Sequence, residues 1–299
     1  MAGGRTAVRG GVTPLLPVTP DGPLDVVREA LRHHGAAVVH ADAAHWAVDG
    51  ERETVRWLGR ELGRLDASFP PAARQRLLAS RRLIKTVAGA VIGADPGELE
   101  ITRAPAGGPR LRGCDGLELS LSHTGSLLAL ALGTSGWPVG ADVERATRRV
   151  GVEPLARRVC TPYERAVLNA TSPAERPLVL LRLWTLKEAY AKGLGVGTRL
   201  PFRTFGFRLC ARTAVLVDDG GRPVRPPEWR FTTHRTDDGH LISVAVGGPP
   251  DASAFHRRNN SGMPSARNPG TLPQLEKSLS RRPANSQGRP IISSSSRLV

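Results

Sequence analysis

From about residue 45 onward, the chain alternates between segments of helical periodicity and short runs of strand-forming residues. Over 72–92, apolar side chains recur every three or four positions, while the intervening positions carry four arginines and a lysine. Similar spacing predicts helices at 51–65, 152–159, 162–169 and 177–192. Short apolar or β-branched runs predict strands at 99–102, 117–121, 127–132, 139–143, 205–209, 214–217, 229–233 and 241–246. Both halves contain helices and strands, which indicates an α+β fold with two small subdomains.

The two ends of the chain differ from this region in composition. The first 44 residues are rich in glycine, proline and alanine, and four prolines between positions 14 and 23 leave only a short helix near 26–33. From about residue 249, serine, asparagine, proline and arginine dominate, which is typical of disorder. We therefore predict a poorly ordered segment at 1–44, an N-terminal lobe at 45–136, a C-terminal lobe at 137–248 and a disordered basic tail at 249–299.

A net charge of +15, from 42 basic and 27 acidic residues, indicates anionic partners. Nucleic acid, a membrane surface, a phosphorylated small molecule and an acidic protein all fit. The tail at 249–299 holds eight basic and two acidic residues, so it supplies +6 of this charge. Much of the excess therefore need not describe the folded region.

The three cysteines, Cys114, Cys160 and Cys210, are too widely spaced for a zinc site built on clustered thiolates. A sparse and odd number of cysteines fits a reducing compartment. The chain has no apolar run of the roughly 20 residues that a membrane span needs, and its N-terminus lacks the apolar region of a signal peptide. We therefore expect a cytoplasmic protein without a membrane partner.

Asp142 and Glu144 lie two positions apart in a predicted strand, so both carboxylates point to one face. Carboxylates this close repel unless a cation lies between them or one is protonated, and their hard oxygens suit Mg²⁺ or Mn²⁺. Two solvated acids on an edge strand would give the same pattern. Glu188 and Lys192 lie four residues apart on the predicted helix at 177–192. Glu188 could add a third carboxylate, and Lys192 could balance phosphate charge. Alone, they could equally be a surface ion pair.

Ser122 and His123 end the predicted strand at 117–121, where a hydroxyl and an imidazole can bind phosphate oxygens. Neighbouring strand residues point to opposite faces, so these two do not form a nucleophile and base, and a structural histidine is the alternative. Arg81 and Lys85 share one face of the helix at 72–92 and could bind phosphate, or form only its solvated face. Neither a P-loop nor a dinucleotide-binding glycine motif is present.

The order of the motifs is more specific than any one of them. Ser122-His123 is followed by G-x-D-x-E, which ends at Glu144, and by W-x-x-K-E-x-x-x-K-G, which begins at Trp184, with Cys160-Thr-Pro-Tyr-Glu between them. This order resembles that of the 4′-phosphopantetheinyl transferase superfamily, and its spacing is similar to the larger, surfactin-synthetase-activating type. The resemblance covers roughly 46–247.

The resemblance implies two similar α+β lobes in a monomeric chain, with coenzyme A in the cleft between them. The implied reaction moves the 4′-phosphopantetheine arm of coenzyme A onto a serine of an apo acyl or peptidyl carrier protein and releases 3′,5′-ADP. Such enzymes serve peptide, polyketide or fatty-acid synthesis, including secondary metabolism.

The resemblance also assigns roles to individual residues. Asp142, Glu144 and Glu188 match positions that hold Mg²⁺, or Mn²⁺, against the pyrophosphate. Glu188 further matches the residue that deprotonates the incoming serine, and Lys192 matches the lysine that contacts the phosphates and assists the leaving group.

Coenzyme A binding is implied for a second set of positions: Ser122, His123, Lys192 and, by a looser alignment, Arg81 and Lys85. Where the family often has Gly-Lys-Pro before the Ser-His strand, this chain has Gly107-Gly-Pro, so the lysine is missing. Arg110 or Arg112 could substitute for it. Two alternatives stay open: a family-like protein that has lost activity, and a non-catalytic basic protein that binds nucleic acid. The second rests on charge alone, because no nucleic-acid-binding motif accompanies it.

Overall fold

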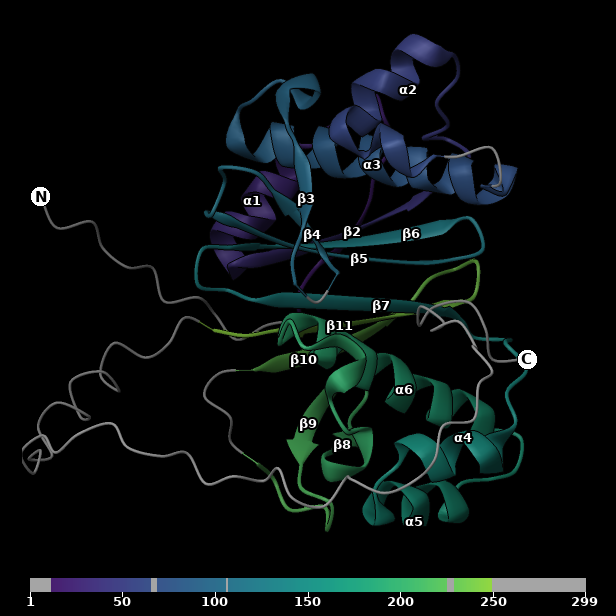
Figure 1. Cartoon of the computed structure of the whole chain (residues 1–299). Coiled ribbons are helices and arrows are strands. Elements are labelled where there is room, and N and C mark those ends of the chain that lie inside the picture. Colours follow the sequence, from purple (N-terminus) through teal and green to yellow (C-terminus); the bar gives the residue numbers. More distant parts are fainter. Residues whose placement is uncertain (1–11, 66–68, 106, 225–228, 249–299) are drawn as a thin grey trace, which may run out of the picture.

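Two β-sheets pack against each other at the centre of the computed structural model, and helices cover their outer faces (Figure 1). The structure describes residues 12–65, 69–105, 107–224 and 229–248. Each sheet comes largely from one half of the chain, so the mixed α+β class predicted from the sequence is confirmed.

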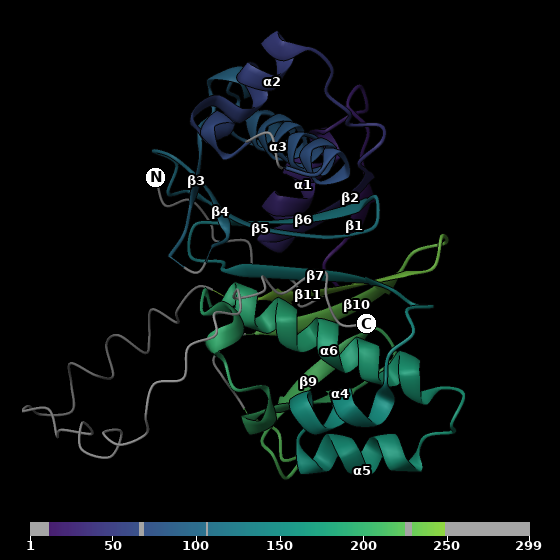
Figure 2. The same ribbon diagram turned by 45° about the vertical axis from the view of Figure 1, so that its right-hand side comes forward.

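The first sheet has the order β1 (Leu15–Pro17), β2 (Ala36–Asp42), β6 (Leu127–Thr134), β5 (Leu117–Thr124). Only the β1–β2 pair is parallel. Helices α1 (Asp25–His34) and α3 (Pro71–Ile92) cover the outer face of this sheet, and α2 (Glu51–Leu58) lies against α3 (Figure 2). The short strands β3 (Ile101–Arg103) and β4 (Pro109–Leu111) form a separate antiparallel pair. Two 3₁₀ turns, Gly59–Arg64 and Pro96–Glu98, complete this lobe.

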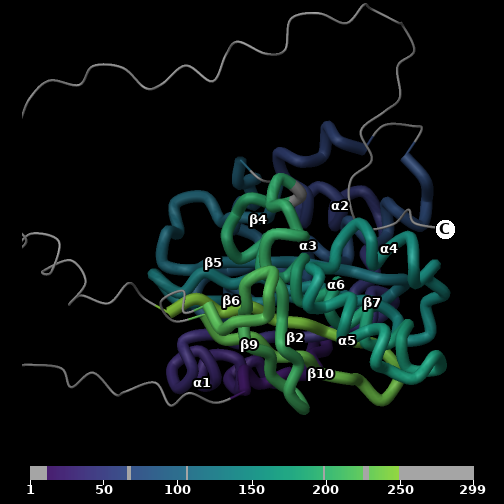
Figure 3. The backbone as a smooth tube through the Cα atoms, turned by 90° about the horizontal axis from the view of Figure 1, so that it is seen from below, coloured from purple at the N-terminus to yellow at the C-terminus, as the bar shows by residue number. Residues whose placement is uncertain are grey.

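The second sheet is antiparallel throughout, in the order β7 (Val139–Arg145), β11 (His240–Val246), β10 (Arg230–Arg235), β9 (Thr213–Val217), β8 (Gly206–Leu209). Its outer face carries α4 (Val152–Val159), α5 (Pro162–Ala170) and α6 (Arg176–Gly193), which lie together on one side in Figure 3. Short 3₁₀ turns at Gly197–Arg199 and Phe202–Thr204 lead from α6 into this sheet. Within the described part of the chain, no helix has both the length and the apolar character needed to cross a membrane.

The prediction of little fixed structure before residue 45 is wrong for 12–42. Apart from the short helix expected near 26–33, which is α1, this segment supplies β1 and β2. Strand β2 lies between β1 and β6, and its first four side chains are buried, so it lacks the polar alternation that marks a half-exposed strand. Residues 1–11 and the predicted tail at 249–299 lie outside the described residues.

Two smaller differences concern the rest of the first lobe. The helix predicted over 51–65 ends at Leu58, because Gly59 has a positive φ of 51° that breaks the helix, and a 3₁₀ turn follows. Strand β4 was not predicted, since three residues carry too little pattern. The predicted lobe boundary at 136/137 falls in the turn between β6 and β7.

The inner faces of the two sheets form one apolar layer. The first sheet contributes Ala36, Val38, Leu127, Ala129 and Ala131, and the second contributes Val139, Ala141, Val143, Ile242, Val244 and Val246. At one side of this layer, β5 passes beside the edge strand β7. The hydroxyls of Ser120 and Ser122 accept hydrogen bonds from the backbone N–H groups of Ala141 (3.1 Å) and Val143 (3.3 Å). Serine side chains therefore satisfy the edge of β7 where a neighbouring strand would otherwise do so.

Candidate active site

Helix α6 lies directly on β7 (Figure 2). The two backbones come this close because glycines lie at the point of contact. A Cβ atom at Gly140 would overlap the carbonyl oxygen of Ala189 and lie 2.5 Å from the nitrogen of Gly193. Residues two apart on a strand share a face, so Asp142 and Glu144 point toward α6 as Gly140 does. The glycines of the G-x-D-x-E and K-G motifs therefore set the spacing between the elements that carry the acids, a role that the sequence interpretation did not assign.

Asp142 is the centre of a network that joins β5, β7 and α6. Its Oδ1 atom accepts hydrogen bonds from Ser122 Oγ at 2.8 Å and from Lys192 Nζ at 2.7 Å. Lys192 also donates to Ser122 Oγ and to the backbone carbonyl of Ala141, each at 3.1 Å. Three residues predicted from separate motifs thus meet at one point on the seam between the lobes.

Glu144 and Glu188 are both buried beside this network. Burial, and to a smaller extent the nearby charge of Asp142, raise the pKa of each carboxyl to about 7. Glu144 also accepts a hydrogen bond from Nη1 of Arg148, which follows it by four residues. The acids of two motifs therefore form one electrostatically coupled group.

The chemistry of this group fits a hard divalent cation, since three buried carboxylates repel one another unless positive charge lies among them. Their present arrangement is not a finished coordination shell. Among the described residues, no three carboxylate, imidazole or thiolate groups are placed as metal ligands. Asp142 instead binds Lys192, and Glu144 binds Arg148.

His123 follows Ser122 on β5, and no hydrogen bond joins the two side chains in the described residues, as the strand geometry predicts. Burial, and after it the positive charges of Arg76 and Lys192, lower the pKa of His123 to about 4. The imidazole is therefore neutral at pH 7. The influence of Arg76 places this half-buried arginine of α3 close enough to the seam to act on His123.

Arg76 was not among the predicted site residues, whereas Arg81 and Lys85 of the same helix were. Arg81 is buried and forms a bidentate pair with Glu61, one bond of which is 2.9 Å long. Lys85 is also buried and donates to the backbone carbonyl of Arg56 at 3.1 Å. Both side chains therefore bind within the first lobe and are not brought to Asp142. Arg76 belongs to the same basic series on α3, and periodicity alone does not indicate which member faces the second lobe.

Lys187, which precedes Glu188 in the W-x-x-K-E motif, points into the core of the second lobe. Its ammonium pairs with Glu164 at 2.8 Å and donates to the carbonyls of Phe202 and Phe205, each at 2.6 Å. Glu164 also caps α5 and accepts a hydrogen bond from the N–H of Phe207 at 2.9 Å. Both charged groups are fully buried, so this pair anchors α6 against α5 and β8.

The loop residues suggested in place of the missing lysine differ in their contacts. Arg112 pairs with Glu100 at 3.0 Å, so its guanidinium is engaged. The exposed side chain of Arg110, on β4, has no hydrogen-bond or ion-pair partner among the described residues. Arg110 is therefore the better placed of the two to bind an added anion.

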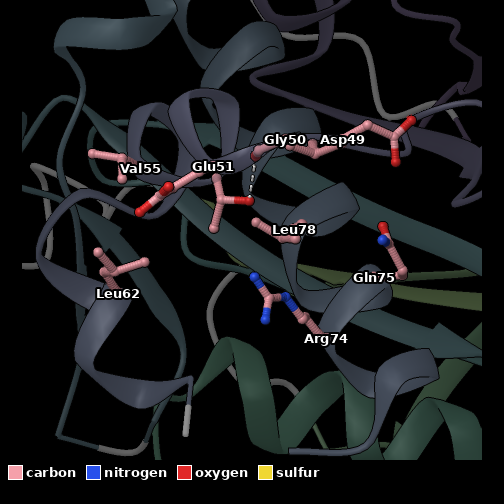
Figure 4. A pocket seen from close by; sticks show the side chains of 10 residues that line it. Asp49, Gly50, Glu51, Val55, Leu62, Arg74, Gln75 and Leu78 are labelled. Atoms are coloured by element: carbon pink, nitrogen blue, oxygen red, sulfur yellow. Dashed lines mark hydrogen bonds between the residues drawn. The ribbon is translucent and has the colours of Figure 1, made fainter. Parts of the chain in front are cut away.

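A cavity of about 550 Å³ lies apart from this site, between α2 and α3 (Figure 4). Glu51, Thr54 and Leu62 line it from the side of α2, and the guanidinium of Arg74 points into it from α3. None of the predicted site residues lines this cavity. The carboxylate group on α6 and β7 therefore remains the candidate active site.

The family model and the relatives that match this chain all belong to the phosphopantetheinyl transferases. The model of the 4′-phosphopantetheinyl transferase superfamily matches residues 138–245, which span β7 to β11. A phosphopantetheinyl transferase from Thraustochytrium sp. is 33% identical over 188 residues, which are 58% of this chain and 64% of that protein. The 4′-phosphopantetheinyl transferase AcpT of Escherichia coli O157:H7 is 32% identical over 131 residues, covering 43% of this chain and 67% of the relative. HetI of Nostoc sp., also a 4′-phosphopantetheinyl transferase, is 27% identical over 63% of this chain and 77% of its own.

A solved holo-(acyl-carrier-protein) synthase from Bacillus anthracis, in complex with CoA (3′,5′-ADP), overlaps 36% of this chain and 93% of its own. Its TM-score is 0.27 and its sequence identity is 20%.

Proposed function

Because this chain belongs to the 4′-phosphopantetheinyl transferase superfamily, we propose that it transfers the phosphopantetheine arm of coenzyme A to a serine of an apo carrier protein. The serine oxygen attacks the phosphorus that bears the pantetheine, and the bond from that phosphorus to the 3′,5′-ADP oxygen breaks. The observation that carries the proposal is the junction of Ser122, Asp142 and Lys192 at the seam between the lobes, with Glu144 and Glu188 beside it.

Glu188 is the proposed acceptor of the serine proton. A carboxyl with a pKa of about 7 is partly ionised at neutral pH, and it holds a proton better than an ordinary glutamate does. Both properties suit a group that must accept a proton from the attacking hydroxyl. Its position on α6, one helical turn before Lys192, places the base beside the cation that would contact the phosphates.

The metal-binding role is proposed for Asp142, Glu144 and Glu188, whose buried oxygens suit Mg²⁺ or Mn²⁺. When bound, such an ion neutralises charge on the pyrophosphate oxygens. Lys192 adds a fixed positive charge next to Asp142, where it can stabilise the departing 3′,5′-ADP.

For coenzyme A itself we propose phosphate contacts from Ser122, the neutral imidazole of His123 and the guanidinium of Arg76. We propose Arg76 for the phosphate contact that the family resemblance implied for Arg81 and Lys85, because Arg81 binds Glu61 and Lys85 binds the carbonyl of Arg56. The carrier protein would bind at the same seam, because its serine must reach the phosphorus beside Glu188.

The proposal is tested by measuring 3′,5′-ADP after incubation with coenzyme A, Mg²⁺ and an apo carrier protein. We expect its release to require the carrier and to fall by at least about 100-fold in the D142N variant, which loses the negative charge that pairs with Lys192. Release that is equally fast without a carrier would identify a hydrolase instead. Near-normal rates in D142N would overturn the assignment of the site.

A further inference from the structure

The guanidinium of Arg148 contacts the carboxylate of Glu144, which is one of the three buried acids of the candidate site. The two residues are joined through Nη1 and Oε1, and their side chains are 23% and 8% exposed. A backbone hydrogen bond of 2.9 Å from the N–H of Arg148 to the carbonyl of Arg145 turns the chain after β7 and brings the arginine back over the carboxylate. The pair is thus fixed by the turn as well as by charge.

Among the described residues, Arg148 and Lys192 are the cations that pair directly with the carboxylate group. Lys192 binds Asp142, and Arg148 binds Glu144, which leaves two cations for three buried acids. A guanidinium does not lose its proton at any ordinary pH, so this counter-charge can be removed only by moving the side chain. A carboxylate oxygen that accepts its hydrogen bond is at the same time less available as a metal ligand.

We propose that Arg148 is a displaceable counter-ion, which holds Glu144 in the metal-free site and leaves it when a divalent cation binds. The inference rests on the proposed function, which assigns the metal to these carboxylates. Binding of the ion must offset the loss of the Arg148–Glu144 pair, so Arg148 lowers the affinity of the free protein for divalent cations. Arg148 also keeps Glu144 oriented until the ion arrives.

The direct test is the affinity of the full chain for Mn²⁺ without coenzyme A, measured by calorimetry or by electron paramagnetic resonance. We expect the R148Q variant to bind Mn²⁺ with a Kd about tenfold lower than that of the wild type, as expected when a charged hydrogen bond no longer competes. General damage to the site would change the affinity in the opposite direction.

The matched control is R149Q, which removes the same charge from the exposed neighbouring residue. Its effect measures the contribution of net charge alone, and we expect it to be much smaller than that of R148Q. A second control places R148Q in the E144Q background, where the gain in affinity should disappear. A gain in R148Q no larger than in R149Q, an unchanged or weaker affinity, or no Mn²⁺ binding by any variant would each overturn the proposal.

Displacement can also be observed on the arginine itself. In ¹⁵N NMR spectra, the Nε–Hε signal of Arg148, identified by its loss in R148Q, should shift on addition of Mg²⁺ to the wild type and remain unchanged in E144Q. A signal that Mg²⁺ leaves unmoved in the wild type would contradict displacement. Failure of this proposal is separable from failure of the proposed function, because the latter is decided by carrier modification in the wild type.

Discussion

Burial gives Glu188 a carboxyl pKa of about 7, well above the ordinary value of 4.5. The charged form of Glu188 is therefore less favourable in the folded protein than in the unfolded chain. Between pH 4.5, the ordinary pKa, and about pH 7, the pKa in the folded protein, the folded state binds more protons than the unfolded state. Stability is thus lost as pH rises through this range, by up to about 3 kcal/mol for one such group. The cost falls on the residue that we propose as the acceptor of the serine proton.

The E188Q variant tests this cost in the metal-free protein. At pH 8 we expect E188Q to melt at a higher temperature than the wild type, because the amide removes an unfavourable buried charge, and the difference should close by about pH 5. Thermal denaturation across this pH range, with chelator present, is the measurement. A constant difference between the two proteins at all pH values would show that Glu188 titrates normally.

Individual site residues could be predicted from the sequence where a motif fixes their spacing and their strand or helix fixes their face. Asp142, Lys192 and Ser122 meet as the motif order suggested. Arg81 and Lys85 do not join them, because Arg81 pairs with Glu61, a partner twenty residues away that no periodicity reveals. Tertiary packing determines which basic side chain of α3 faces the candidate site.

Among the elements, α6 carries two different charged groups on its two sides. Glu188 and Lys192 face β7, whereas Lys187 points to Glu164 in the core. Adjacent residues on a helix differ by about 100° in direction, which places anchor and proposed base on separate faces. The Lys187 anchor therefore fixes the rotation of α6 that presents Glu188.

The anchor predicts a characteristic pattern of stabilities. K187M should lose about 3–5 kcal/mol of unfolding free energy, because Glu164 is left buried without a counter-charge. The double variant E164Q/K187M should recover much of this loss, since neither charge then remains. Urea denaturation of both variants measures the effect, and an equal or greater loss in the double variant would argue against a mutually neutralising pair.

Helices and strands with a long apolar pattern of their own could be predicted from the sequence. Strands whose burial depends on the adjacent strands of the sheet could not. The long apolar patterns of α3, α6 and β11 predict these elements from the sequence. The sequence pattern did not predict strand β2, because both of its faces are buried and its small apolar residues follow a proline-rich segment. Its place between β1 and β6 is a property of the sheet and not of its own residues.

For the whole molecule, the seam between the two sheets positions the candidate site. Ser122 comes from the first sheet, Asp142 from the second, and their contact depends on β5 lying beside β7. No local pattern predicts how two lobes meet, so the sequence alone supported this arrangement only through a family resemblance. The structure supplies the physical reason, in serine hydroxyls that bind the edge of β7 and glycines that admit α6.

The proposed transfer is tested most directly by the intact mass of an apo carrier protein after incubation with this chain, coenzyme A and Mg²⁺. We expect a carrier heavier by one phosphopantetheine arm, attached at a serine, and modification at least about 100-fold slower with the D142N variant. An unchanged mass across acyl and peptidyl carriers, with protein shown to be folded, would contradict the proposed transfer.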